Sequence, residues 1–219
     1  MPVAVPVKVK VCGITDEAGF DAAITAGADW IGFVFFPPSP RFVTPERAAA
    51  IASRNIGGPP RVGLFVDPSD DAIAASLDAL TLDILQIYAP APRVASLRRR
   101  FGRPVWRPVG VAQPADLPQN AEGCDALLIE ARPPAEATRP GGNARRFDWS
   151  ILAGWKAPAP WLLGGGLNPG NVAAAIAASG APAVDVSSGV ERRPGRKDPA
   201  LIGAFVRAAH SPAPPGRLA

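Results

Sequence analysis

Histidine is almost absent from this sequence, and the only one, His210, lies close to the C-terminus. Histidine is the most common metal ligand in proteins and the side chain best suited to proton transfer near neutral pH. A single histidine beside a predicted disordered tail argues against both roles here. Proton transfer must then fall to a cysteine, a carboxylate or a tyrosine, and we expect no bound metal.

Cysteine is scarce as well, with only Cys12 and Cys124. Two distant cysteines are too few for a disulfide framework or a metal cluster, which favours a reducing compartment. The N-terminus lacks the apolar region of a signal peptide, and no apolar run approaches the ~18 residues that cross a bilayer. We therefore expect a cytoplasmic protein with no membrane partner.

A nucleic-acid partner is not expected either, although the net charge is +4 and the pI is near 9.6. Five arginines cluster in one predicted helical segment: Arg93, Arg98, Arg99, Arg100 and Arg103. No aromatic residues are interleaved with them to stack on bases, so a solvated helix face is the simpler interpretation. The glycine run at residues 164–170 fails the G-x-G-x-x-G spacing, and G-x-x-x-x-G-K-[ST] is missing from the sequence.

Short β-branched or aromatic runs alternate along the chain with segments of helical character. The eight predicted strands cover residues 7–11, 30–36, 61–65, 82–87, 105–109, 126–129, 161–163 and 183–186. The predicted helical segments cover residues 16–26, 45–53, 69–80, 92–101, 114–117, 149–155, 168–178 and 199–208. Alternation favours parallel pairing, and eight units fit a closed (β/α)₈ TIM barrel better than an open sheet. We expect one α/β barrel domain over residues 1–210 and a disordered tail over residues 211–219.

Small residues follow the last two predicted strands, where a barrel of this class holds its chemistry. Gly164-Gly165-Gly166 follows the seventh strand, with a helix expected to open at Pro169, and Ser187-Ser188-Gly189 follows the eighth. Such loops leave backbone N–H groups free to bind a phosphate. We predict a phosphate-bearing substrate; the alternative is that both loops are tight turns that need positive φ.

Cys12 ends the first predicted strand and shares a strand face with Lys10, about 7 Å away by the strand rise. A nearby ammonium lowers the pKa of a thiol, so we expect Lys10 to lower that of Cys12. Asp185 on the eighth strand is a plausible ion-pair partner for Lys10, because the first and last strands adjoin in a closed barrel. Cys124 is interpreted as an inert core residue.

Glu130 ends an apolar strand, and apolar surroundings raise the pKa of a carboxyl group. We interpret it as an acid that faces Cys12, against the alternative of a surface glutamate. Arg41 is a candidate anchor for an anionic ring substituent, against the alternative of a surface arginine. The Pro- and Gly-rich loop through residues 139–143 is interpreted as a mobile lid.

The sequence resembles the phosphoribosylanthranilate isomerase family of tryptophan biosynthesis from the first strand to the last helix. The matching stretches are residues 10–15 (KVCGIT), 27–35 (GADWIGFVF), 39–41 (SPR), 62–66 (VGLFV), 139–142 (RPGG), 147–149 (FDW), 164–167 (GGGL) and 184–191 (VDVSSGVE).

The resemblance implies a cofactor-free Amadori rearrangement of N-(5-phosphoribosyl)anthranilate to 1-(2-carboxyphenylamino)-1-deoxyribulose 5-phosphate. It implies that Cys12 is the general base and Glu130, in place of the usual aspartate, the general acid. We expect a small-molecule substrate and a monomer or homodimer. The candidate substrate-binding residues are Arg41, Gly142, Gly165, Gly166, Asp185, Ser187, Ser188 and Gly189.

Three positions depart from the family's pattern: Glu130, Tyr88 where histidine is common, and Ala144 where glycine is common. An altered site leaves open a barrel that binds a phosphosugar without catalysis. Another phosphosugar barrel enzyme is a second alternative. Indole-glycerol-phosphate synthase normally relies on catalytic lysines, but Lys156 and Lys197 lie outside the predicted strand ends. A pentose-phosphate epimerase usually needs histidines and a metal, and those histidines are lacking.

Overall fold

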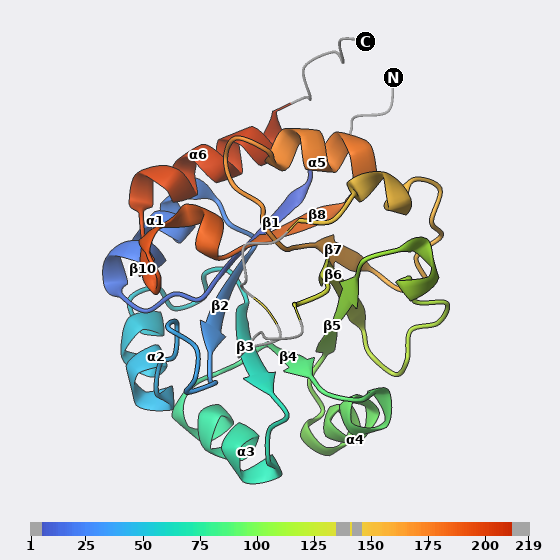
Figure 1. The fold of residues 1–219 in the computed structure, drawn as a ribbon. Coiled ribbons are helices and arrows are strands. Elements are labelled where there is room, and N and C mark those ends of the chain that lie inside the picture. Colours follow the sequence, from blue (N-terminus) through green and yellow to red (C-terminus); the bar gives the residue numbers. More distant parts are fainter. Residues whose placement is uncertain (1–5, 135–140, 142–145, 212–219) are drawn as a thin grey trace.

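The computed structural model describes residues 6–134, 141 and 146–211. Its eight parallel strands close into a barrel, which Figure 1 shows with helices on the outside. The strands are β1 (Lys8–Cys12), β2 (Trp30–Val34), β3 (Arg61–Val66), β4 (Ile84–Tyr88), β5 (Val105–Val111), β6 (Ala126–Ala131), β7 (Trp161–Leu163) and β8 (Ala183–Val186). The helices are α1 (Glu17–Ala26), α2 (Pro45–Ala52), α3 (Asp70–Ala79), α4 (Ala91–Phe101), α5 (Val172–Ser179) and α6 (Pro199–His210).

The predicted (β/α)₈ barrel is confirmed, and every strand lies within two residues of its predicted bounds. The strands pair in sequence order, and β1 closes the barrel against β8, with Lys10 opposite Asp185. Side-chain caps fix where the helices begin. The Asp16 carboxylate accepts a hydrogen bond from Gly19 N at 2.9 Å, and Asp198 does the same for Ala200 N at 2.8 Å.

Three predicted helical segments differ from the structure. The segments at residues 114–117 and 149–155 form only the short 3₁₀ helices η1 (Pro114–Asp116) and η2 (Trp149–Leu152). The helix after β7 begins at Val172 instead of Pro169, because Gly170 and the Asn168–Asn171 hydrogen bonds hold a turn there. Helix α6 extends to His210 and Ser211 follows as its C-cap, so the rest of the predicted tail, residues 212–219, lies outside the described residues.

Successive strand residues face opposite sides of the barrel wall. One apolar cluster draws residues from β3 to β8, and they meet across the barrel interior: Val62, Ile84, Trp106, Ala126, Leu128, Leu162 and Ala183. The opposite faces of the strands pack under the helices in the larger apolar cluster. Two residues further along the strands, the same inward face becomes polar or charged, with Lys10, Gln86 and Asp185, and then with Cys12, Tyr88 and Glu130. The polar end of the barrel interior is therefore the carboxyl end of the strands.

A short hairpin follows β8 and was not predicted. The 3₁₀ turn η3 (Ser188–Val190) leads into β9 (Glu191–Arg193), which pairs antiparallel with β10 (Arg196–Lys197). This pairing places Lys197 opposite Glu191 beside the predicted phosphate loop. Across the described residues, no helix has the length and apolar character needed to span a membrane.

Candidate active site

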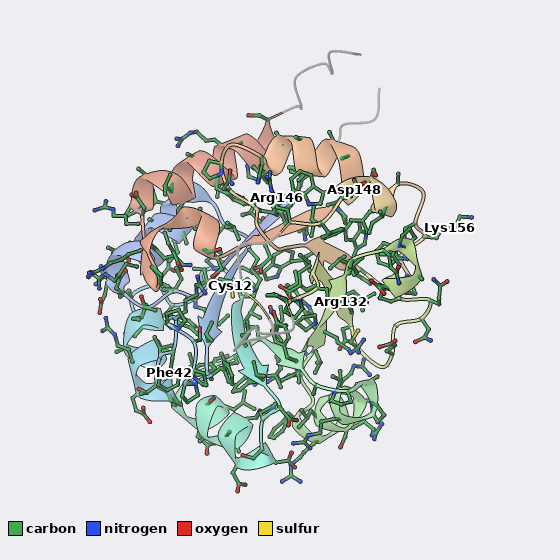
Figure 2. All side chains as sticks on the ribbon, in the orientation of Figure 1. Cys12, Phe42, Arg132, Arg146, Asp148 and Lys156 are labelled. Carbon is green, nitrogen blue, oxygen red and sulfur yellow. The ribbon has the colours of Figure 1, made fainter. Side chains whose placement is uncertain are left out.

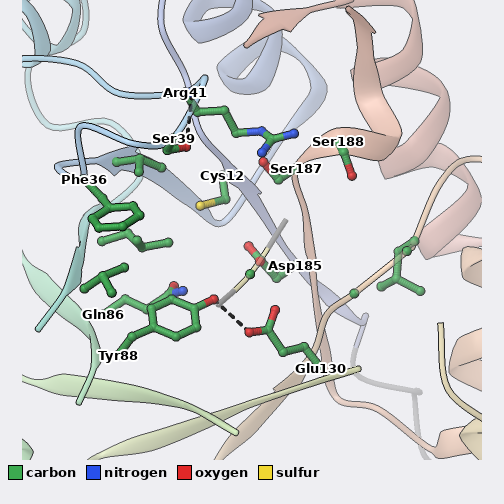
Figure 3. A pocket seen from close by; sticks show the side chains of 17 residues that line it. Cys12, Phe36, Ser39, Arg41, Gln86, Tyr88, Glu130, Asp185, Ser187 and Ser188 are labelled. Carbon is green, nitrogen blue, oxygen red and sulfur yellow. Dashed lines mark hydrogen bonds between the residues drawn. The ribbon is translucent and has the colours of Figure 1, made fainter. Parts of the chain in front are cut away.

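One pocket opens at the carboxyl ends of the strands and collects most of the residues singled out in the sequence (Figure 3). Of the candidate residues, Cys12, Arg41, Glu130, Gly165, Gly166, Asp185, Ser187 and Ser188 all line it. Gly189 follows Ser188 in the same loop, and a Cβ at this position would overlap the Leu167 carbonyl group. Gly142, like most of the predicted lid and Ala144, falls outside the described residues. The residues that line the pocket come from seven of the eight strands or the loops that follow them.

Lys10 and Asp185 form the predicted ion pair inside the barrel, with Nζ 2.8 Å from Oδ1. The Lys10 side chain is fully buried. Burial by itself lowers the pKa of Lys10, but the attraction of Asp185, with a smaller contribution from Cys12, outweighs burial and raises it. Lys10 therefore keeps its proton, and it lies two residues before Cys12 on the same face of β1.

The Cys12 thiol is 3% exposed and points into the pocket. Burial raises its pKa, and the opposing effects of Lys10 and Lys197 do not reverse this. The sequence-based expectation of a lowered pKa is therefore wrong in direction. The physical reason is that burial outweighs the lowering effect of Lys10, whose ammonium is paired with Asp185, and the charge of Asp185 also disfavours the thiolate.

Glu130 is 7% exposed, and burial raises the pKa of its carboxyl group to about 8. This confirms the expectation from its apolar strand. The Tyr88 hydroxyl donates a hydrogen bond to Glu130 Oε1 at 2.9 Å, which lowers the pKa of the carboxyl group but only partly offsets burial (Figure 3). The pKa of Tyr88 is raised well above its ordinary value by burial and by the neighbouring Glu130, so the phenol keeps its proton.

Arg41 is 4% exposed and is held by a residue that the sequence analysis did not single out. Its Nε and Nη2 atoms donate to Oε1 and Oε2 of Glu191 at 2.7 and 2.9 Å. Lys197 Nζ also donates to Glu191 Oε1 at 2.8 Å and to the Ser187 carbonyl oxygen at 2.9 Å. The position of Lys197 outside the strand ends hid this contact; the β9–β10 hairpin carries it to Ser187, which lines the pocket.

The loops after β7 and β8 form one wall of the pocket. Gly165 and Gly166 have φ values of +82° and +66°, a left-handed conformation that favours glycine. Asn171 stabilises the turn by donating from Nδ2 to the Gly166 carbonyl at 3.0 Å. Within the described part of the chain, the N–H groups of Gly165, Gly166, Ser188 and Gly189 donate to no other group. The turn interpretation and the anion-binding interpretation are thus compatible.

Gln86 is the polar residue of the pocket that sequence reasoning missed. It is 1% exposed, and neither its Nε2 nor its Oε1 has a hydrogen-bond partner among the described residues. The available signal was its register: Gln86 lies two residues before Tyr88 on β4 and so faces the same side. Among the described residues, no group of three His, Cys, Asp or Glu side chains is placed to hold a metal ion.

Fold and pocket together define a class: an enzyme on a (β/α)₈ barrel, with a buried thiol and a buried carboxyl group in one pocket at the carboxyl ends of the strands. Residues 9–208 match the family model of N-(5'-phosphoribosyl)anthranilate (PRA) isomerase. The chain belongs to this family. It is an isomerase of tryptophan biosynthesis, as the resemblance implied.

Individual relatives support the assignment over nearly the full chain. The N-(5'-phosphoribosyl)anthranilate isomerase of Acidiphilium cryptum is 58% identical over 204 residues, which cover 93% of this chain and 98% of that relative. Among solved structures, monomers of the dimeric isomerase from Thermotoga maritima are 33% identical with a TM-score of 0.78, covering 93% of this chain and 98% of that one. A PRA isomerase in complex with reduced 1-(o-carboxyphenylamino)-1-deoxyribulose 5-phosphate is 32% identical with a TM-score of 0.77, at the same coverage.

Proposed function

We propose that Glu130 and Cys12 carry out the isomerisation of N-(5-phosphoribosyl)anthranilate as general acid and general base. The observation that carries this proposal is the presence of a carboxyl group with a pKa of about 8 in the same buried pocket as a thiol. An acid that keeps its proton near neutral pH can protonate a sugar ring oxygen.

The chemistry divides into two proton transfers. Glu130 protonates the furanose ring oxygen, the bond from that oxygen to C1 breaks, and the anthranilate nitrogen forms a C=N bond to C1. The Cys12 thiolate then takes the proton from C2, and the electron pair forms a C1=C2 enolamine as the C=N electrons return to nitrogen. Tautomerisation of the enolamine gives the C2 ketone of the product.

The protonation state of the pair follows from this sequence. The competent form carries one proton on Glu130 and none on Cys12. Burial raises the pKa of both groups, to about 8 for Glu130 and above the ordinary thiol value for Cys12. The pair therefore holds a single proton at mildly alkaline pH, and because the pKa of Cys12 is the higher of the two, the competent form is the minority arrangement of that proton.

The remaining pocket residues suit the two ends of the substrate. The bare N–H groups of the loops after β7 and β8 would bind the phosphate, together with the Ser187 and Ser188 hydroxyls. Arg41 would bind the anthranilate carboxylate through Nη1, since Glu191 occupies Nε and Nη2. Asp185 would accept from a sugar hydroxyl with the oxygen that Lys10 does not hold. The apolar wall for the aromatic ring is made by Val34, Phe36, Leu64 and Val66.

A fluorescence assay tests the proposal. The fluorescence of phosphoribosylanthranilate should disappear when the protein is added without metal or nucleotide. Cys12→Ala and Glu130→Gln should each abolish turnover, whereas Cys124→Ser should not, because Cys124 is buried away from the pocket and donates to the Ala121 carbonyl. A near-normal kcat in Glu130→Gln or Cys12→Ala would remove that residue from the mechanism.

We also propose a cytoplasmic location and a monomer or homodimer. A T. maritima neighbour is described as monomers of a dimeric isomerase, which supports weighing both states. Sedimentation of the purified chain over a range of concentrations distinguishes them.

A further inference from the structure

Tyr88 has no assigned part in the two proton transfers, yet among the described residues it alone donates a side-chain hydrogen bond to the proposed acid. Its hydroxyl lies 2.9 Å from Glu130 Oε1, and both side chains project into the pocket from the carboxyl ends of β4 and β6 (Figure 3). Tyr88 is also the single tyrosine of the sequence.

We propose that Tyr88 is a positioning residue that fixes which oxygen of Glu130 carries the transferred proton. This inference rests on the proposed acid role of Glu130. A neutral phenol that donates to Oε1 makes Oε1 the acceptor oxygen of the carboxyl group. The acid proton is then confined to Oε2, the oxygen left free to face the substrate.

The length of the acid explains why such a restraint matters. A glutamate has one more rotatable bond than an aspartate, so an unrestrained carboxyl group would sample more orientations. The tyrosine ring has only two side-chain torsions and presents its hydroxyl with little freedom. Proton transfer depends steeply on placement, and a restraint on one oxygen places the other.

Gly141 leaves room for the contact between Tyr88 and Glu130 because it has no side chain. A Cβ at Gly141 would overlap the Tyr88 hydroxyl and lie 3.3 Å from Glu130 Oε1. A residue larger than glycine at position 141 would therefore push the phenol off the carboxyl group.

The charges that surround Glu130 set the sign of the pH effect. The charges come from Asp185 on β8 and Lys10 on β1, the neutral Tyr88 on β4 acts through its hydrogen bond, and Cys12 is a further titratable group that acts on Tyr88. A hydrogen bond from Tyr88 favours the ionised carboxylate, so it lowers the pKa of Glu130 against the larger effect of burial. Weakening this bond raises the pKa of Glu130, and strengthening it lowers that pKa.

Because the chain has one tyrosine, biosynthetic incorporation of 3-fluorotyrosine changes Tyr88 alone. The ring fluorine makes the phenol a stronger donor. The rising limb of the kcat/KM profile, which follows loss of the first proton from the Cys12–Glu130 pair, should shift to lower pH. Tyr88→Phe should shift the same limb to higher pH and reduce kcat about tenfold with KM little changed, since orientation and not binding is lost.

A ¹⁹F titration distinguishes positioning from packing, because a Tyr88 that only packed against its neighbours would not report the ionisation of Glu130. The fluorine resonance at position 88 should titrate with Glu130, and Glu130→Gln should remove that step. If neither substitution moves the limb and the resonance does not titrate, the positioning role is wrong. If Tyr88→Phe misfolds, the fluorotyrosine protein still decides the question. If the unmodified enzyme leaves phosphoribosylanthranilate unchanged while the resonance titrates with Glu130, the proposed function fails and the contact stands.

Discussion

Arg41 and Glu191 are joined by two parallel hydrogen bonds of 2.7 and 2.9 Å, and their side chains are 5% and 4% exposed. The same carboxylate accepts from Lys197, which in turn donates to the Ser187 carbonyl oxygen. One glutamate therefore connects the arginine proposed to bind the substrate carboxylate with the loop proposed to bind its phosphate. The two recognition elements are held at a fixed separation by a buried cluster of three charges.

Glu191→Gln should destabilise the fold by about 3 kcal/mol or more at pH 7, because it leaves two buried cations without their counter-charge. Burial acts to raise the pKa of Glu191, but Arg41 and Lys197 outweigh burial and lower it. A depressed folded-state pKa contributes stability above the unfolded value near 4.5, which is lost as the pH falls through the folded value. Urea unfolding at pH 7 and in the acid range measures both effects. Equal midpoints for variant and wild type at pH 7 would contradict the prediction.

Lys197→Met should raise KM for phosphoribosylanthranilate about tenfold with a smaller change in kcat, because a charge-assisted hydrogen bond to the Ser187 carbonyl is lost behind the phosphate loop. Lys156→Met is the matched control: Lys156 is exposed and lies at the periphery, far from Cys12 at the barrel axis (Figure 2). Steady-state kinetics on both variants decide the point. A KM for Lys197→Met that matches that of the control would show that Lys197 has no part in phosphate binding.

The kcat/KM profile should be bell-shaped with its maximum above pH 8. The productive form needs the pair to have lost one proton, and the first loss occurs near the raised pKa of Glu130, about 8. Loss of the second proton, at the raised pKa of Cys12, leaves both groups ionised, so no proton remains for the acid step and the profile falls. Initial rates from pH 6 to pH 10 test this. An enzyme with constant kcat/KM down to pH 6 would rule out the assigned pair.

Alkylation of Cys12 by iodoacetamide should be slower at pH 7 than that of a free thiol and should accelerate as the pH rises, because burial raises the pKa of the thiol. Inorganic phosphate or the ribulose product should protect it by filling the shared pocket. A Cys124→Ser background ensures that the label reports on Cys12 alone. Rapid modification at neutral pH would indicate a thiolate and would reverse the assigned direction of the shift.

The barrel and the candidate site were largely predictable from local sequence patterns. Alternation along Lys8–Cys12 placed Lys10 and Cys12 on one face, and barrel closure made the Lys10–Asp185 pair predictable. The pattern did not show that η2 would be a single 3₁₀ turn, or that α5 would begin three residues after Pro169, since both depend on turn hydrogen bonds made in the folded chain.

What the sequence by itself determined is the architecture and the set of candidate side chains at the strand ends, because strand periodicity and strand ends are local properties. Only the tertiary structure decided the energetics of those side chains. Three features depend on distances between residues far apart in the chain: whether Lys10 or burial sets the pKa of Cys12, how the β9–β10 hairpin brings Glu191 to Arg41 and Lys197 to Ser187, and which oxygen of Glu130 Tyr88 contacts. Electrostatic interactions and desolvation depend on distance and burial in space, and neither is encoded in sequence separation.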